Sequence, residues 1–235
     1  MPFTSVMGAQ SIIKPGVATS GTRPASPFNG QVLYETDTAK IVSWNGSAWV
    51  YTAAAGGLVP ITPTSIAVGG GTATSAGNGQ VTFTSVTTSL SLNGVFSALY
   101  TNYRIVLFAE AASAAMAPHI RMRVGGTNDS SGSYDFQQVY AVGAGTAGYQ
   151  VANQTSWSVS VSSVQVHVST FDIYRPFLAQ PTSGIYTYSE QNSLVTVGAF
   201  NVGGMLHDES TSYDGISFLV GVGITGTVSV YGYAI

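Results

Sequence analysis

The sequence predicts an all-β protein: a small N-terminal three-stranded β-meander followed by an antiparallel β-sandwich of the jelly-roll type. Of its 235 residues, 45% are hydrophobic and 7% charged, with thirteen Tyr and ten Phe. Aromatic and β-branched residues suit the pleated surface of a sheet. From residue 80 onward, short alternating segments are separated by turn residues at even spacing, as in a sandwich. Ala111–Ala117 is the one helix-friendly segment, and Pro118 ends it within about two turns.

Turn-rich and strand-like segments divide the chain into four parts. Residues 1–20 show no sustained hydrophobic period and are interpreted as a leader, in which Ser11–Ile13 could form one short strand. Residues 21–51 form the meander, and residues 52–79, rich in Gly and Pro, are predicted to be a linker. Residues 80–235 form the sandwich.

The meander is predicted from three β-prone segments and two turns. The segments are Gln31–Thr36, Ile41–Trp44 and Trp49–Tyr51. Asp37–Lys40 separates the first two and Asn45–Ala48 the last two. Asp and Asn accept local backbone hydrogen bonds, and Asn-Gly tolerates positive φ, so both separators favour tight turns.

Four aromatic residues of the meander are the predicted oligomer contacts. A sheet of about thirty residues is too small to bury Tyr34, Trp44, Trp49 and Tyr51 alone. Three copies could bury the indole rings around one axis, so a homotrimer is predicted.

Alternation within the sandwich predicts which residues face the core. In residues 164–169, the three valines are predicted inward, and Gln165, His167 and Ser169 outward. In residues 120–124, Ile, Met and Val are predicted inward and the two arginines outward. The predicted strands are 81–84, 90–93, 95–100, 103–109, 120–124, 134–142, 156–161, 164–173, 184–188, 194–200, 216–222 and 227–233.

Ionisable residues do not form a recognisable catalytic or metal-binding pattern. His119, His167 and His207 lack ligand spacing and are predicted on the surface, with His207–Glu209 in a solvated loop. Asn128–Gly132, followed by Asp135, is similar to a calcium loop but lacks its twelfth-position glutamate. No nucleophile elbow and no phosphate-loop lysine occur. No catalytic residue, metal site or cofactor is therefore predicted, and the protein is not expected to be an enzyme.

Composition excludes several classes of partner. The formal net charge is −3, and Lys14 and Lys40 are the two lysines, so the chain lacks the basic footprint of a nucleic-acid-binding protein. It has no cysteine, hence neither disulfides nor thiolate metal sites. The first residues do not match a signal peptide, and Phe218–Ile224 is too short to span a membrane. Synthesis as a soluble cytoplasmic protein without membrane insertion is expected.

The surplus of aromatic residues admits two interpretations. Exposed tyrosines can stack on sugar rings, which suits a glycan receptor, whereas buried ones fill the core or a subunit interface. The second interpretation is favoured for most of them. The residues concerned are Tyr134, Phe136, Tyr140, Tyr149, Tyr186, Tyr188 and Tyr213.

Three motifs in residues 22–49 resemble a module of bacteriophage tail-fibre and other virion fibre proteins. They read TRPASPFNGQ (22–31), YETDT (34–38) and WNGSAW (44–49), in the order that this module has. The terminal VSVYG (228–232) is also similar to distal fibre domains. The resemblance implies a tail-fibre or minor tail protein located in the virion.

The resemblance also implies partners and alternatives. The leader is expected to attach to other virion proteins of the tail tip, baseplate or capsid. The sandwich is expected to face host surface glycan or protein, where multivalency strengthens weak sites. Two alternatives stay open: a capsid decoration or head-fibre protein, and a glycan-degrading tail enzyme.

Overall fold

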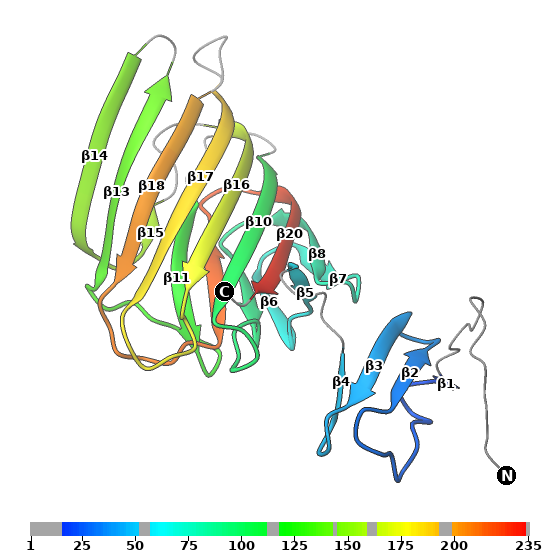
Figure 1. Cartoon of the computed structure of the whole chain (residues 1–235). Coiled ribbons are helices and arrows are strands. Elements are labelled where there is room, and N and C mark those ends of the chain that lie inside the picture. The colour runs from blue at the N-terminus through cyan, green and yellow to red at the C-terminus, as the bar shows by residue number, and fades with distance from the viewer. Residues whose placement is uncertain are drawn as a thin grey trace, which may run out of the picture. The chain divides into compact units, whose positions relative to one another are not determined.

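A computed structural model describes residues 16–51, 57–111, 118–142, 145–158, 164–192 and 199–233 (Figure 1). All elements in these ranges are strands, which confirms the predicted all-β class with a β-sandwich. The chain divides into two compact units, Met1–Ala55 and Gly56–Ile235. The strand expected at Ser11–Ile13 and the helix-friendly residues 112–117 lie outside the described ranges.

The first unit is a four-stranded sheet in the order β1-β2-β3-β4. Strands β2 (Val32–Glu35), β3 (Lys40–Trp44) and β4 (Trp49–Tyr51) confirm the three predicted strands. Strand β1 (Gly16–Ala18), which falls in the predicted leader, adds a parallel edge to β2. Gly16 permits this close pairing, since a side-chain carbon there would lie 2.7 Å from Leu33 Cδ2.

Side-chain hydrogen bonds shape the connections of the first unit. The Asp37 carboxylate accepts the Ser20 amide at 2.9 and 3.0 Å, which ties the β2–β3 turn to the segment after β1. Asn45 Oδ1 accepts the amides of Ser47 and Ala48 at 3.0 and 2.8 Å. Gly46 has φ +98°, which a residue without a side chain adopts freely. The predicted local turn chemistry is thus present at the β3–β4 turn, whereas the Asp37 carboxylate binds a segment seventeen residues away.

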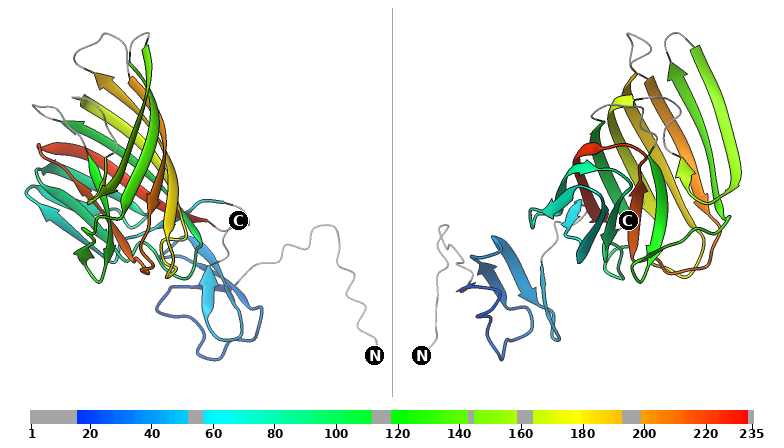
Figure 2. Two further views of the ribbon diagram at one scale, coloured as in Figure 1. Left: turned by 90° about the vertical axis from the view of Figure 1, so that its left-hand side faces the viewer. Right: turned by 180° about the vertical axis from the view of Figure 1, so that it is seen from behind.

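The second unit consists of two sheets (Figure 2). The larger sheet has ten strands, in the spatial order β14 (Gly145–Gln154), β13 (Tyr134–Val142), β18 (Ala199–His207), β17 (Thr182–Asn192), β16 (Val164–Tyr174), β10 (Asn102–Ala111), β20 (Ile224–Tyr233), β8 (Gln80–Val86) and β7 (Thr72–Ser75), with β5 (Val59–Ile61) paired to β20. The smaller sheet has the order β12 (Thr127–Asn128), β11 (His119–Val124), β19 (Gly215–Leu219), β9 (Ser89–Asn93) and β6 (Ser65–Gly69), with β15 (Trp157–Ser158) paired to β11.

The core of the second unit is formed by inward side chains of both sheets. Phe171 of the larger sheet and Phe218 of the smaller one are fully buried, with ring centroids 6.3 Å apart. Trp157, Tyr103 and Ile105 are also fully buried. Burial of apolar surface between the sheets is the main stabilising contribution expected for this unit.

Several predicted boundaries are wrong. The expected linker 52–79 contains β5, β6 and β7, which pair with strands of the second unit; its Gly and Pro residues are compatible with short strands at sheet margins. Residues 95–100 are not a strand, although Val95 and Phe96 are buried. Strand β14 was not predicted, because as an edge strand with mostly exposed side chains it lacks apolar alternation.

The predicted faces of β16 are reversed. His167 and Ser169 are buried, whereas Val168 is exposed. Phe171 and Ile173 share the parity of His167 and are fully buried. A strand has one register for all its side chains, so the two larger residues place His167 and Ser169 inside with them.

The predicted faces of β11 are correct in part. Ile120 and Met122 are buried and Val124 is exposed. Arg123, expected on the surface, is buried and donates hydrogen bonds to Asn93 Oδ1 at 2.9 Å and Ser217 Oγ at 2.9 Å. Burial lowers the pKa of Arg123. Hydroxyl and amide oxygens satisfy this guanidinium, a pattern that alternation along one strand does not reveal.

Candidate binding surfaces

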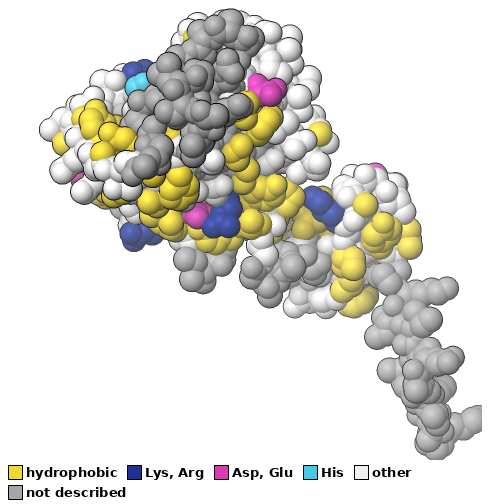
Figure 3. Space-filling model, turned by 90° about the horizontal axis from the view of Figure 1, so that it is seen from above, with side chains coloured by type: hydrophobic (Ala, Val, Ile, Leu, Met, Phe, Trp, Pro, Cys, Tyr) yellow, Lys and Arg dark blue, Asp and Glu magenta, His cyan; other side chains and the backbone are white. Residues whose placement is uncertain are grey.

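One face of the four-stranded sheet is apolar and exposed. Because paired residues point to the same side of a sheet, the registers Val17–Tyr34–Ile41 and Val32–Ser43–Val50 define this face. Its five large hydrophobic side chains are all exposed. We call these six residues the apolar face. Hydrophobic side chains are visible on the surface of this unit in the space-filling view (Figure 3).

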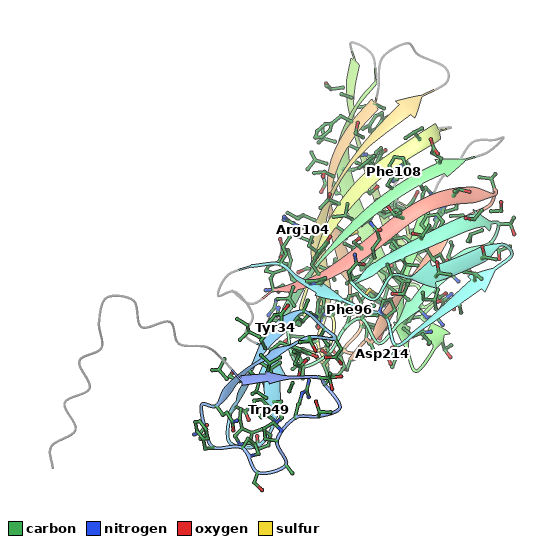
Figure 4. All side chains as sticks on the ribbon, turned by 90° about the vertical axis from the view of Figure 1, so that its right-hand side faces the viewer. Tyr34, Trp49, Phe96, Arg104, Phe108 and Asp214 are labelled. Atoms are coloured by element: carbon green, nitrogen blue, oxygen red, sulfur yellow. The ribbon has the colours of Figure 1, made fainter. Side chains whose placement is uncertain are left out.

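The four predicted oligomer contacts are divided between the two faces. Tyr34 lies on the apolar face. Trp44, Trp49 and Tyr51 lie on the opposite face, in register with buried Val42 and with one another. Trp44 and Trp49 are half-buried and meet edge to face, with centroids 5.7 Å apart. Figure 4 labels Tyr34 and Trp49.

A charged pair holds the Pro-rich segment against the tryptophan-bearing face. The Arg23 guanidinium pairs with the Glu35 carboxylate, whose side chain is fully buried. Thr38 Oγ1 donates a second hydrogen bond to Glu35, at 2.9 Å. The hydrogen bond from Arg23 holds the pKa of Glu35 below its ordinary value, against the opposing effect of burial. Arg23 of the TRPASPFNGQ motif and Glu35 of the YETDT motif therefore have a shared structural role, which is to form this ion pair.

The outer face of the larger sheet is rich in valine, threonine and phenylalanine. One cross-strand row consists of Val139, Val202, Thr187, Thr170 and Val106. Phe108 is exposed on the same face of β10 as Arg104, which pairs with Asp172 at 2.8 and 2.7 Å (Figure 4). The cross-strand row described above therefore carries no charged side chain.

A shallow hollow of about 330 Å³ lies at the β14–β13–β18 end of this outer face. Its polar wall is formed by Asp135, Gln137 and Gln150, and Leu206 adds an apolar side. Gly204 also lines the hollow, and a side-chain carbon there would meet no atom within 4 Å. A carboxylate and two amides beside an apolar wall can bind a small neutral ligand rich in hydroxyl groups.

His207, predicted in a solvated loop, is fully buried at the end of β18. Its Nε2 lies 3.2 Å from Asp129 Oδ2 and 2.8 Å from the Tyr213 hydroxyl, and its ring stacks on Tyr134 at 4.0 Å. Although burial alone raises the pKa of Asp129, hydrogen bonds from Tyr213 and Ser131 lower it to about 2. This network connects the 129–133 turn to β18.

His167 lies in a buried polar layer on the inner face of the larger sheet. Its Nε2 contacts Ser169 Oγ, and its ring is 5.2 Å from that of Tyr188. Asn201 Nδ2 donates to the Tyr188 hydroxyl at 3.1 Å. Burial lowers the pKa of His167 to about 4, so the imidazole is neutral at physiological pH.

The remaining histidine and the candidate metal ligands are dispersed. His119 is half-buried, with Nδ1 3.1 Å from Ser156 Oγ, and burial lowers its pKa. Within the described residues, no group of three His, Cys, Asp or Glu could hold a metal ion. In the same part of the chain, no helix has the length and hydropathy of a membrane span.

The aromatic side chains of the sandwich are mostly internal, as favoured from the sequence. Tyr134, Phe136, Tyr186, Tyr188 and Tyr213 are buried. Tyr140 is half-buried and Tyr149 is exposed. Sequence reasoning missed the hollow at Gly204, because β14 was not predicted and its Gln150 faces Gln137 across the β13–β14 pairing.

Comparisons with known proteins give a distant structural likeness. No protein-family model matches the chain, and a comparison with curated proteins gives no match. Among solved structures, the crystal structure of the Emp47p carbohydrate recognition domain is similar at 12% identity and a TM-score of 0.26, covering 72% of this chain and 89% of that chain. A likeness this distant carries no argument about fold, ligands or function.

Proposed function

We propose that this chain is a structural protein of a bacteriophage virion, of the tail-fibre or minor-tail type, that displays its sandwich toward the host surface. The first unit joins copies of the chain into a homotrimer and, with the N-terminal residues, attaches to other virion proteins. The observation that carries the proposal is the contrast between the units. The first exposes an apolar face, and the second has a complete core between two sheets.

The motifs that resemble virion fibre modules support this proposal through their structural roles. Arg23 pairs with Glu35, Asp37 binds Ser20, and Asn45 closes the last turn. Each contact stabilises a small sheet without demanding a large core, as a module that is buried by assembly requires.

The hollow at Gly204 is the proposed contact site for the host surface. Its donors and acceptors suit the hydroxyl groups of a neutral oligosaccharide, and Leu206 suits the apolar side of a sugar ring. The Asp135 carboxylate disfavours ligands with acidic groups through like-charge repulsion. Repetition of the site in a homotrimer increases avidity.

A glycan array probed with the intact protein tests the receptor role. We expect binding to neutral oligosaccharides, and a loss of at least tenfold in Gly204→Leu, which fills the hollow. Gly221→Leu is the matched control, because a side-chain carbon at Gly221 also meets no atom within 4 Å. Equal binding by both variants contradicts this site. No binding of the intact oligomer to any glycan or host cell contradicts the receptor role.

Antibody labelling of virus particles in electron micrographs tests the location. Label at the tail supports the proposal, whereas label with capsid symmetry supports a decoration or head-fibre protein instead. Release of reducing ends from host glycan by the purified protein would favour a glycan-degrading enzyme and contradict the structural role.

A further inference from the structure

We infer that the smaller sheet of the sandwich carries a binding site for small organic carboxylates that have an apolar group, built from His119, Arg121 and Ser156. A hollow of about 500 Å³ is lined by these three side chains and by residues 219–222. The site belongs to a different sheet from the hollow at Gly204. It goes beyond the proposed function and does not depend on it.

Strand pairing brings the three polar side chains together. His119 and Arg121 are two residues apart on β11, so their side chains share one face of the sheet. Ile120, between them, is fully buried, so this shared face points away from the core. β15 pairs with β11 at His119, and Ser156 just before β15 places its Oγ 3.1 Å from His119 Nδ1.

The guanidinium of Arg121 is held in position without an anionic partner. Its Nε donates to the Thr155 carbonyl at 2.8 Å, and its Nη2 donates to Thr155 Oγ1 at 3.1 Å. Among the described residues, Nη1 has no hydrogen-bond acceptor and Arg121 forms no ion pair, whereas Arg23 and Arg104 are paired with carboxylates. Arg121 therefore offers a fixed cation and a remaining donor, the groups that recognise a carboxylate.

His119 supplies a second donor to the hollow. When the Ser156 hydroxyl donates to Nδ1, the proton of the neutral imidazole lies on Nε2, which has no hydrogen-bond partner in the described part of the chain. Burial and then the charge of Arg121 lower the pKa of His119. A bound carboxylate should oppose both effects and raise this pKa. The other described elements at the hollow, β15, β19 and residues 220–222, contribute no titratable side chain.

The rest of the lining determines the class of ligand. Leu219, Val220 and Val222 provide an apolar wall, and none of the lining residues is acidic. Leu219 is paired with His119 across β11 and β19, so the wall begins directly beside the polar group. A side-chain carbon at Gly221 would meet no atom within 4 Å, which leaves room against this wall. A carboxylate with a short apolar chain can therefore satisfy both sides of the hollow.

NMR titration of the full-length chain with sodium hexanoate tests the inference. We expect a dissociation constant on the order of 1 mM, the scale of a ligand with few atoms. Bound hexanoate should raise the titration midpoint of the His119 imidazole by about half a pH unit or more. Hexanamide has the same apolar chain without the charge, and inorganic phosphate and glucuronate carry charge without that chain. Each of these three should bind at least tenfold more weakly.

Two variants with matched controls locate the site. Arg121→Gln removes the cation, and Gly221→Leu fills the hollow, so each should weaken hexanoate binding at least tenfold. Arg175→Gln changes an arginine of another hollow, and Gly204→Leu fills the proposed glycan site, so both should bind hexanoate like the wild type. The fluorescence of Trp157, which pairs with β11, shows whether each variant is folded. Should Arg121→Gln not fold, Gly221→Leu carries the test.

The outcomes decide for or against this site separately from the proposed function. Absence of hexanoate binding overturns the inference, and so does equal binding of hexanamide, phosphate or glucuronate. Hexanoate binding that is unchanged in the folded variants at Arg121 and Gly221 also overturns it. Hexanoate binding by a chain that recognises no glycan or host cell leaves the inference standing and contradicts only the receptor role.

Discussion

The two units of this protein use the same antiparallel strands but bury their side chains in different ways. In the sandwich, two sheets cover each other, and large aromatic residues such as Trp157 and Phe171 are fully buried. In the four-stranded sheet, Leu33 and Val42 are buried on one face, and the largest side chains, Trp44 and Trp49, are half-buried. A sheet needs a second layer, and in the described residues 16–51 no second sheet is present.

The difference shows which interactions can substitute for a core. The four-stranded sheet uses short-range polar contacts: the Arg23–Glu35 pair, the Asp37 carboxylate on Ser20, and the Asn45 turn. The neutral hydrogen bonds of the Asn45 turn are worth about 1 kcal/mol, whereas the contact of the exposed Asp37 carboxylate is screened by solvent. These polar contacts can specify a conformation, and in the homotrimer that we propose the bulk of the stabilisation is expected to come from burial on association.

A Trp→Ala substitution in each unit tests this comparison directly and should give the largest change in the free energy of unfolding. Trp157→Ala should lower the free energy of unfolding of the sandwich by about 3–5 kcal/mol, because it leaves a cavity in the core. It also removes the indole hydrogen bonds to the carbonyls of Asp135 and Leu206, at 3.2 and 3.0 Å. Trp49→Ala should cost the four-stranded sheet about 1–2 kcal/mol, because its ring is half-buried.

Urea unfolding followed by far-UV circular dichroism measures the effect on the sandwich, because Trp157→Ala removes its one tryptophan. Tryptophan fluorescence from Trp44 measures the effect of Trp49→Ala on the first unit. The edge-to-face rings of Trp44 and Trp49 should give an exciton signal in circular dichroism. This signal of the first unit should survive in Trp157→Ala, as expected if the two units unfold independently. Equal losses from the two substitutions would contradict the distinction between a self-sufficient and an assembly-dependent unit.

Sequence patterns located the first unit better than the second, for a physical reason. The strands β2, β3 and β4 are separated by the turn segments Asp37–Lys40 and Asn45–Ala48. The second of these is closed by local hydrogen bonds to Asn45 that depend on no distant partner. In the sandwich, the faces depend on distant partners. His167 is inside because Phe171 and Ile173 share its parity, and Arg123 is buried because oxygens of β9 and β19 surround it.

The candidate sites follow the same division. The apolar face can be derived from alternation once β1 is paired with β2, but that pairing joins a segment assigned to the leader. The hollow at Gly204 depends on the order β14-β13-β18, which joins strands that are distant in sequence. His207 was assigned to the surface because its acidic neighbours suggested a loop, whereas its ring completes a network with Asp129 and Tyr213.

The buried polar layer predicts a loss of sandwich stability as the pH falls from about 6.5 to 4. The pKa of His167 in the folded chain is about 4, below its ordinary value of 6.5. Between these values the unfolded chain binds more protons, so stability is full above about pH 6.5 and falls as the pH drops toward 4. The loss should reach about 3 kcal/mol at most and level off below the folded-state pKa.

His167→Gln is the variant that isolates this effect. Glutamine can keep a hydrogen bond to Ser169 but does not titrate, so its stability should vary less between pH 6.5 and 4 than that of the wild type. His119, whose pKa burial also lowers, contributes the same background to both proteins. If the stability of the two proteins changes equally with pH in urea unfolding, the pKa of His167 is not lowered by folding, and the prediction is wrong.

The smallest expected effect concerns the last turn of the first unit and tests whether polar contacts there are local. Asn45 Oδ1 accepts hydrogen bonds from the amides of Ser47 and Ala48 at 3.0 and 2.8 Å. The turn connects the paired residues Trp44 and Trp49. Asn45→Ala removes both hydrogen bonds and should lower the stability of the sheet by about 1 kcal/mol. Asn45→Asp, which keeps an acceptor at the same position, should retain most of it. The exciton signal of the tryptophan pair, followed during thermal unfolding, measures the change.

Because the turn is remote in register from Val17 and Tyr34 on the apolar face, the oligomer mass should not change. A loss of mass in Asn45→Ala would show that this turn and the assembly surface are coupled.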